Sequence, residues 1–417
     1  MRLVHLTLGA TLIPGALVFA QATQPPRLRS GVELVAVDAH VVDGRGNPVV
    51  DLQPADFRVT IGGRDRPVVS VQLISYGTGA ATVPPAGKVA ASGTQADPQR
   101  PRRMFILAID EHSLHISNAM AAVNAAQRFI DRLQPDDVVG LQAYPTGAAR
   151  HDMTTDHASV RRQLEKITGL FSEPASRFNL SPTEAIDIAS GDRDAQLAVA
   201  RRECPSGGCN QNEIRNEAIS LAGTIEMRVS QSVGGLRGLV RGLAEVPGRK
   251  TLVLVSGGLI MTDRGSGRAN AGAEIAALGR EAAQGNVSVF ALHLDWSFLE
   301  TVSARRGLRP TYFRDSNMAA TGLEMVAGTA GGTVLRVQGT SPDVAFDRVL
   351  RETSAHYLLG VDIAGENRDG QARAIRVRVN RRGASVRSRT IVVIPKSGDS
   401  HLSFLAKPQR SQRRQMR

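Results

Sequence analysis

The sequence of 417 residues is poor in aromatic side chains, which make up 4% of it and include a single tryptophan. Proteins that bind single-stranded nucleic acid stack the bases on aromatic side chains beside a basic groove. The net charge of +12 would attract an anionic polymer, but the arginines are scattered and no aromatic series accompanies them. We therefore expect no nucleic-acid partner. The hydrophobic content of 42% predicts globular cores built mainly from valine, leucine, isoleucine and alanine.

Several catalytic signatures are also absent. No Gly-x-x-x-x-Gly-Lys loop for nucleotide phosphates occurs. Ser256 lies between a strand pattern and two glycines, but Leu254 stands where the nucleophile elbow of a serine hydrolase has glycine. Asp110, His112 and His115 are residue types that suit zinc, yet histidines without ligand spacing are more often solvated loop residues. We therefore expect no catalytic residues.

Cysteine is nearly absent, with two residues in the whole chain. Cys204 and Cys209 enclose Pro-Ser-Gly-Gly, a flexible turn whose ends can meet. The spacing is not that of a CxxC redox motif. In an oxidising compartment we expect the two to form a disulfide that pins a local loop, contributing about 2 kcal/mol.

Long apolar stretches are lacking too: beyond the first residues, no run approaches the roughly 20 apolar residues that span a bilayer. Residues 1–22 combine Arg2, an apolar run and a small-residue site at Ala20-Gln21-Ala22, a pattern typical of a signal peptide. We expect a secreted or periplasmic protein without a membrane span after signal removal. Residues 396–417 are basic and lack an apolar period, which predicts a disordered tail. This tail is a candidate for docking on anionic envelope polymers.

The centre of the chain alternates between strand and helix patterns. Residues 104–110, MFILAID, are apolar at almost every position and end in a carboxylate, as a strand buried on both faces of a parallel sheet does. Residues 104–354 therefore predict an α/β domain with a doubly wound, mostly parallel, Rossmann-like sheet. Residues 170–230 interrupt the alternation, and we expect them to form a helical insertion at the functional edge of the sheet.

Short strand patterns flank this domain. Residues 31–76 predict four strands and residues 355–395 three or four more, all separated by turn residues. Neither segment alone has enough strands to form the two packed sheets of a β-sandwich. Either the two segments pair in one β-sandwich-like region, or the C-terminal strands fold separately. Residues 77–103 are rich in Gly, Ala, Ser, Thr and Pro and are expected to be a flexible linker.

A set of short segments also occurs in a characteristic order, at residues 41–49, 51–52, 56–59, 105–110, 129–137, 248–258, 287–294, 329–332 and 357–360. Together they resemble the bacterial VWFA-related family of exported proteins, which has a von Willebrand factor type A fold. The resemblance spans about residues 31 to 394. It implies a binding module outside the cytoplasm, so the expected partner is an unknown extracellular or envelope protein.

The resemblance also implies a metal site. Type A domains that bind a ligand hold Mg²⁺ in a metal-ion-dependent adhesion site (MIDAS), made by an Asp-x-Ser-x-Ser loop after the first strand, a later threonine and a late aspartate. In this chain Asp110 matches the first ligand, His112 and Leu114 occupy the serine positions, and Gly257 occupies the position of the late aspartate. Leu114 cannot bind a metal and Gly257 lacks the carboxylate that the ion needs.

We therefore expect a degenerate adhesion site and no cofactor. Mg²⁺ would bind at Asp110 only if other oxygen ligands, such as Asp263 or Ser181 and Thr183, replaced the missing ones.

The sequence thus predicts an exported, non-enzymatic, adhesion-type protein-binding module. Its expected binding surface is the edge of the sheet, formed by Asp110, His112, Ser113, Ser256, Gly257 and Asp263. The alternative is an exported hydrolase that uses Asp110 and His112. Phosphatases with an aspartate nucleophile usually carry a second carboxylate two residues later, where this chain has His112.

Overall fold

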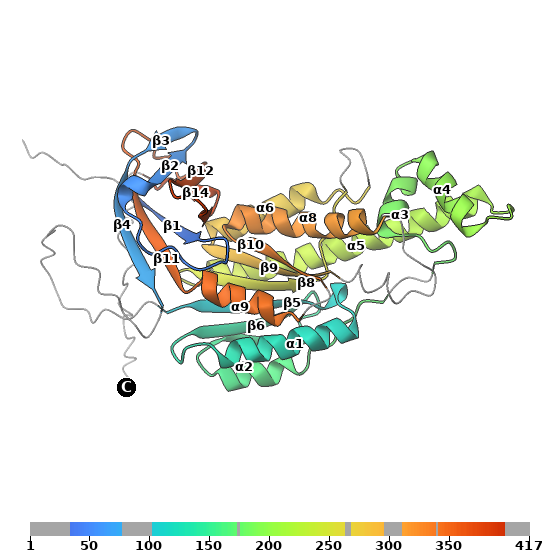
Figure 1. Cartoon of the computed structure of the whole chain (residues 1–417), viewed down its shortest axis with the longest axis horizontal. Coiled ribbons are helices and arrows are strands. Elements are labelled where there is room, and N and C mark those ends of the chain that lie inside the picture. Colours follow the sequence, from blue (N-terminus) through green and yellow to red (C-terminus); the bar gives the residue numbers. More distant parts are fainter. Residues whose placement is uncertain are drawn as a thin grey trace, which may run out of the picture.

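The computed structural model describes residues 34–76, 102–172, 176–262, 268–295, 311–338 and 341–396. The expected signal peptide at 1–22 lies outside these residues, as do 77–101 of the expected linker and 397–417 of the expected tail. Figure 1 shows β sheets at one end of the long axis, an α/β domain in the middle, and helices α3 and α4 at the other end. None of the described helices combines the length and apolarity that crossing a bilayer requires.

The α/β domain contains a six-stranded sheet in the order β10-β9-β8-β5-β6-β7. Five strands are parallel and the edge strand β7 runs antiparallel to β6, so the mixed α/β fold with a mostly parallel sheet is confirmed. The strands are β5 (Met104–Asp110), β6 (Val138–Tyr144), β7 (Arg150–Thr154), β8 (Lys250–Ser256), β9 (Val287–Asp295) and β10 (Thr333–Gln338). We did not expect β7, because its residues are polar and lack a strand pattern.

Helices cover both faces of this sheet (Figure 1). One face carries α1 (Ile116–Asp131), α2 (His157–Leu164) and α9 (Asp343–Glu352). The other carries α5 (Gln211–Ala244), α6 (Gly272–Gln284) and α8 (Tyr312–Ala330). Helix α8 begins well before the helix expected at 323–327, and it ends at Gly331, whose φ of +78° suits glycine.

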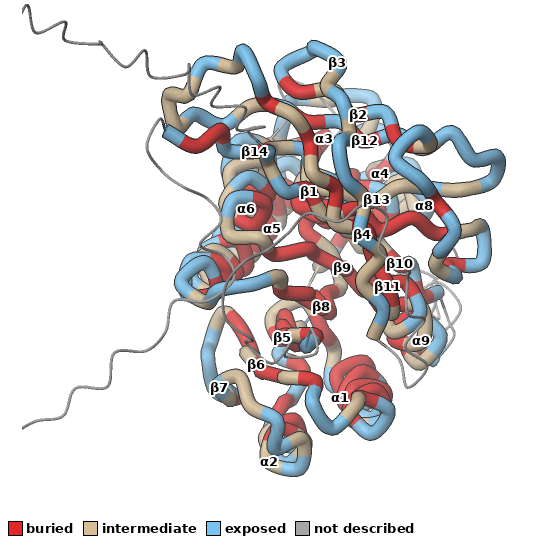
Figure 2. The backbone as a smooth tube through the Cα atoms, turned by 90° about the vertical axis from the view of Figure 1, so that its left-hand side faces the viewer, coloured by how far each residue is buried: buried red, intermediate tan, exposed pale blue. Residues whose placement is uncertain are grey.

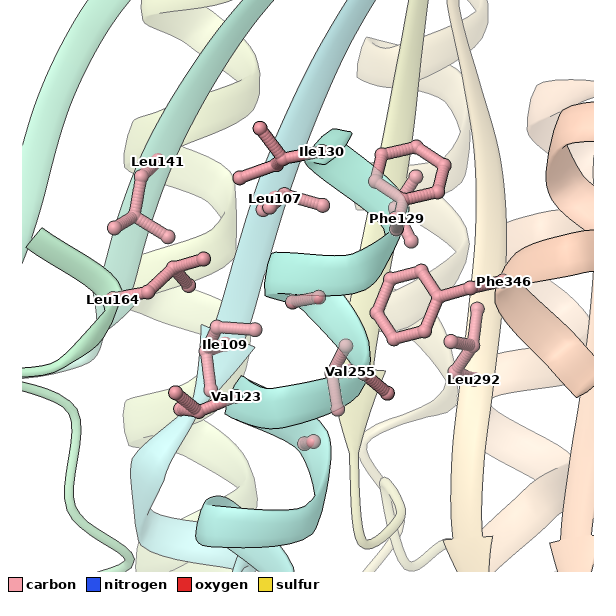
Figure 3. Close-up of a cluster of buried hydrophobic side chains, with 14 of the residues drawn as sticks. Leu107, Ile109, Val123, Phe129, Ile130, Leu141, Leu164, Val255, Leu292 and Phe346 are labelled. Carbon is pink, nitrogen blue, oxygen red and sulfur yellow. The ribbon is translucent and has the colours of Figure 1, made fainter. Parts of the chain in front are cut away.

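The apolar run of β5 is explained by these two faces. Leu107 and Ile109 point into the core beneath α1, where Phe129 and Phe346 also lie (Figure 3). Ile106 and Ala108 point into the opposite core. Strands β8 and β9 are buried along their whole length and appear red in Figure 2. Every position of a central strand therefore needs an apolar or well-partnered side chain.

The expected insertion consists of α3 (Pro182–Ala189), α4 (Arg193–Glu203) and the first half of α5. Ser181 caps α3 in a capping box with Glu184, and a small apolar core joins the three helices. Cys204 and Cys209 form a disulfide between α4 and α5, with their Cα atoms 5.9 Å apart. Because α5 continues to Ala244 along the sheet, it connects the insertion rigidly to the domain.

The flanking strands form two antiparallel sheets, in the orders β13-β1-β11-β4 and β14-β12-β2-β3. The strands before the α/β domain are β1 (Leu34–Val42), β2 (Phe57–Ile61), β3 (Arg64–Arg66) and β4 (Val68–Ser75). Those after it are β11 (Ala355–Asp362), β12 (Ala372–Val379), β13 (Ser385–Arg387) and β14 (Ile391–Val393). Strand β1 pairs with β11 and β2 pairs with β12, and one apolar core lies between the sheets. Of the two arrangements left open, the structure has the shared one.

The end of the expected linker is ordered. Arg103 is buried and forms an ion pair with Asp137, while its guanidinium lies over the rings of Tyr76 and Phe105. The flexible composition therefore does not extend to residue 103, where the chain already enters the sheet.

Candidate functional site

Asp110 ends β5 at the carboxyl edge of the parallel strands and is 0% exposed. The hydroxyl of Ser232 on α5 lies 3.0 and 3.1 Å from its two carboxylate oxygens. The hydroxyl of Ser256, the last residue of β8, donates to the same carboxylate at 3.0 Å. Two serines from two different elements thus satisfy a carboxylate that water does not reach.

The loops that follow β5 and β8 interlock beside this carboxylate. The Ser113 hydroxyl donates to the Asp110 carbonyl at 3.0 Å and accepts a hydrogen bond from the Gly257 N–H at 2.8 Å. A Cβ atom on Gly257 would lie 2.2 Å from the Ser113 carbonyl oxygen. Only glycine therefore permits this approach of the two loops.

Burial dominates the electrostatics of the site. It raises the pKa of Asp110 from 3.8 to about 6. Hydrogen bonds from Ser232, Ser256 and Ser113, and the charge of His112, act in the opposite direction. The carboxyl is thus held close to its titration point near neutral pH, in a place closed to solvent.

The structure brings together four of the six residues expected at the edge of the sheet, namely Asp110, Ser113, Ser256 and Gly257. His112 lies half-buried in the same short turn. Asp263 lies outside the described residues.

The two residues considered as substitute ligands, Ser181 and Thr183, do not contact Asp110. The Ser181 hydroxyl accepts a hydrogen bond from Thr311 at 2.8 Å, and the Thr183 N–H donates to Asp315 at 2.8 Å. They attach α3 to the start of α8.

Ser232 is the site residue that the sequence did not reveal, because it lies more than 100 positions after Asp110 in a helix. A signal was nevertheless present. Ile225, Val229, Val233 and Leu236 form the buried stripe of α5, and Ser232 is the polar residue within that stripe. A hydroxyl on the buried face of a helix needs a polar partner, and here the partner is Asp110.

These residues do not fit the Mg²⁺ site that the family resemblance implies. Both carboxylate oxygens of Asp110 already accept hydrogen bonds from serines. Leu114 is 0% exposed and belongs to the apolar core, and no carboxylate fits at Gly257. The described part of the chain contains no group of three or more His, Cys, Asp or Glu side chains that could hold a metal ion.

Exposed apolar side chains lie on α1, on the segment after α2 and on α5, close in the chain to residues that contact Asp110 or the turn after β5. Ile116 and Met120, one turn apart on α1, are 64% and 61% exposed, and Leu170 and Met227 are 48% and 54% exposed. Phe171 contacts the chain neighbours of two of them, because its ring lies 4.5 Å from that of His115 and beneath the guanidinium of Arg228. We call Ile116, Met120, Leu170, Phe171 and Met227 the rim patch.

Backbone hydrogen bonds and close packing hold residues 169–171 of the rim patch against the turn after β5. The Leu170 N–H donates to the Glu111 carbonyl at 2.8 Å, and the Phe171 N–H donates to the Leu114 carbonyl at 3.0 Å. A Cβ on Gly169 would lie 2.4 Å from backbone atoms of Leu114 and His115. The segment that follows α2 is therefore pressed against the turn after β5.

No protein-family model matches this chain, and no curated protein shows significant sequence similarity to it.

Proposed function

We propose that the chain is an exported, non-enzymatic protein-binding module with a von Willebrand factor type A-like domain, and that the rim patch holds the partner protein. The observation that carries this proposal is the rim patch itself, in which four large apolar side chains are about half exposed or more. Grouped apolar side chains on a surface are typical of interaction sites. Ligands of open α/β sheets also bind at the carboxyl ends of the strands, where this patch lies.

In this proposal Asp110 has a structural role. Its carboxylate ties β5 to β8 and α5 through Ser256 and Ser232, and so holds the loops beneath the rim patch in one arrangement. Partner binding is then independent of Mg²⁺, unlike binding through a MIDAS.

The alternative of a hydrolase that uses Asp110 and His112 is less well supported. A pKa of about 6 suits a general acid or base, but a reacting carboxyl must reach its substrate. Asp110 is 0% exposed, and serine hydroxyls occupy its oxygens.

Partner capture by matched variants tests the proposal. The full chain without residues 1–22 is immobilised and exposed to an envelope extract, beside the variant Ile116→Ser/Met120→Ser. The control is Val69→Ser/Val393→Ser, which removes two apolar side chains that are 49% and 43% exposed in the β sheets. We expect a protein retained by the wild type and the control but lost from the rim variant. Equal retention by all three would refute a role of the rim patch.

A calorimetric titration tests the metal question. We expect no binding heat when Mg²⁺ or Mn²⁺ is added to the full chain, and no effect of a chelator on partner retention. Metal binding by the wild type that disappears in Asp110→Ala would show that a metal displaces the serine hydrogen bonds of Asp110. The site would then be a working metal-ion-dependent adhesion site.

A further inference from the structure

A second polar cluster lies at the opposite end of the parallel strands, where the β sheets meet the α/β domain. A small pocket there is lined by Asp38 on β1, Arg249 just before β8, Ser288 on β9 and Arg389 after β13. The pocket thus joins two residues of the β sheets to two residues of the α/β domain. No part of the proposed partner-binding function uses it.

The two arginines have unused hydrogen-bond donors. Arg249 donates to Ser288 at 3.0 Å and to His40, and Arg389 donates to the Ala36 carbonyl at 2.8 Å. Arg249 Nη1 and Arg389 Nε are buried without a hydrogen-bond partner among the described residues. Buried donors of native proteins nearly always have a partner, which can be a bound ion or water.

The charge of the pocket is unbalanced. Asp38 is the carboxylate in its lining, and its oxygen lies 3.7 Å from Arg249 Nη1. It therefore offsets one of the two guanidinium groups. The nearby carboxylate of Glu352 does not offset the other guanidinium, because it already pairs with Arg348 and Arg387.

The neighbouring histidines do not supply the missing charge either. A guanidinium only donates hydrogen bonds, so the Nε2 atom of His40 that faces Arg249 accepts. The proton of His40 then lies on Nδ1, which donates to the Ala355 carbonyl at 3.1 Å. The ring of His356 lies 5.7 Å from that of His40, and burial beside Arg249 disfavours its charged form.

We propose that this pocket binds one chloride-sized monovalent anion between Arg249 and Arg389, where the β sheets meet the α/β domain. The pocket has room for about one water-sized group. It is too small for sulfate or phosphate, and a chloride ion, which is somewhat larger than water, fits only with a small outward shift of the arginine side chains. Water would satisfy the free donors but would leave the second guanidinium uncompensated. An anion satisfies both requirements, and it connects Arg389 of the β sheets to Arg249 of the α/β domain.

Thermal unfolding of the full chain without residues 1–22 tests this proposal. Sodium chloride and sodium bromide are compared with sodium gluconate at constant ionic strength. We expect a rise in melting temperature with chloride or bromide that levels off as the site fills, and none with gluconate. The rise should disappear in Arg389→Gln and persist in Arg378→Gln, a control at an exposed arginine of β12. Equal responses to all three salts, or a response that persists in Arg389→Gln, would overturn the proposal.

A crystallographic measurement on the wild type covers the case in which Arg389→Gln does not fold. Crystals grown in bromide should show an anomalous peak within hydrogen-bond distance of Arg249 Nη1 and Arg389 Nε. A pocket that contains only water under these conditions would refute anion binding.

Discussion

Asp110 shows what the burial of one carboxyl does to the stability of the chain. Its folded-state pKa of about 6 exceeds the reference value of 3.8. The folded state therefore retains a proton that the unfolded chain has already released. The stabilisation is complete below about pH 3.8 and is lost as the pH rises through about 6.

This linkage predicts the behaviour of Asp110→Asn, which carries no titrating carboxyl. As the pH rises from about 4 to about 8, the free energy of unfolding of the wild type should fall relative to that of the variant by about 2 kcal/mol. Urea unfolding at a series of pH values measures this difference. A difference that does not change with pH would show that Asp110 titrates normally.

At the scale of elements, the contact between the turn after β5 and the loop after β8 depends on Gly257. The substitution Gly257→Ala places a Cβ 2.2 Å from the Ser113 carbonyl oxygen. We expect it to lower the free energy of unfolding by about 2 kcal/mol or more, as overpacking does. Gly238→Ala is the control, since a Cβ there meets nothing within 4 Å on the exposed face of α5. It should be neutral or stabilise by up to about 1 kcal/mol. Equal effects of the two substitutions in urea unfolding would contradict this account.

The elements also show what the sequence could and could not predict. β5 was foreseen because a strand buried on both faces needs a continuous apolar run, a property that β8 and β9 share. β7 was missed because an edge strand such as Arg150–Thr154 is held by pairing with β6 and carries no apolar pattern. The start of α8 was missed because it packs against polar groups of the insertion.

The sequence likewise predicted some residues of the candidate site but not the contacts between them. Asp110 was foreseen from its place after an apolar run, and the resemblance drew attention to Gly257. The contacts of Ser232 and Ser256 with Asp110 depend on the packing of α5 and β8 beside β5. The place of Ser232 in an apolar stripe signals that its hydroxyl needs a polar partner, but a single sequence does not show which residue that partner is.

At the scale of the whole molecule, two neutral histidines lie where the β sheets meet the α/β domain. Burial, together with Arg249, lowers the pKa of His356 to about 3, and the same causes lower that of His40. The unfolded chain therefore takes up protons below about pH 6.5 while the folded chain does not. The contribution of these histidines to stability should be complete above this pH and be lost as the pH decreases toward 3.

The variant His356→Phe tests this prediction, because it keeps an aromatic ring beside Tyr76 but cannot titrate. At about pH 4 we expect the wild type to have lost about 3 kcal/mol of unfolding free energy relative to the variant, compared with pH 7.5. His151→Phe, on edge strand β7, serves as the control and should follow the wild type. Identical pH profiles of the wild type and His356→Phe would rule out His356 as the cause.

The pairing of β1 with β11 has a consequence for biosynthesis. Leu34 pairs with Asp362, so the partner of the first strand leaves the ribosome roughly 15 to 60 s later at ordinary rates of translation. Until then β1 and β4 lack the strand that lies between them, so their edges remain unpaired. A chain truncated before β11 would keep two exposed β edges, a form prone to aggregate.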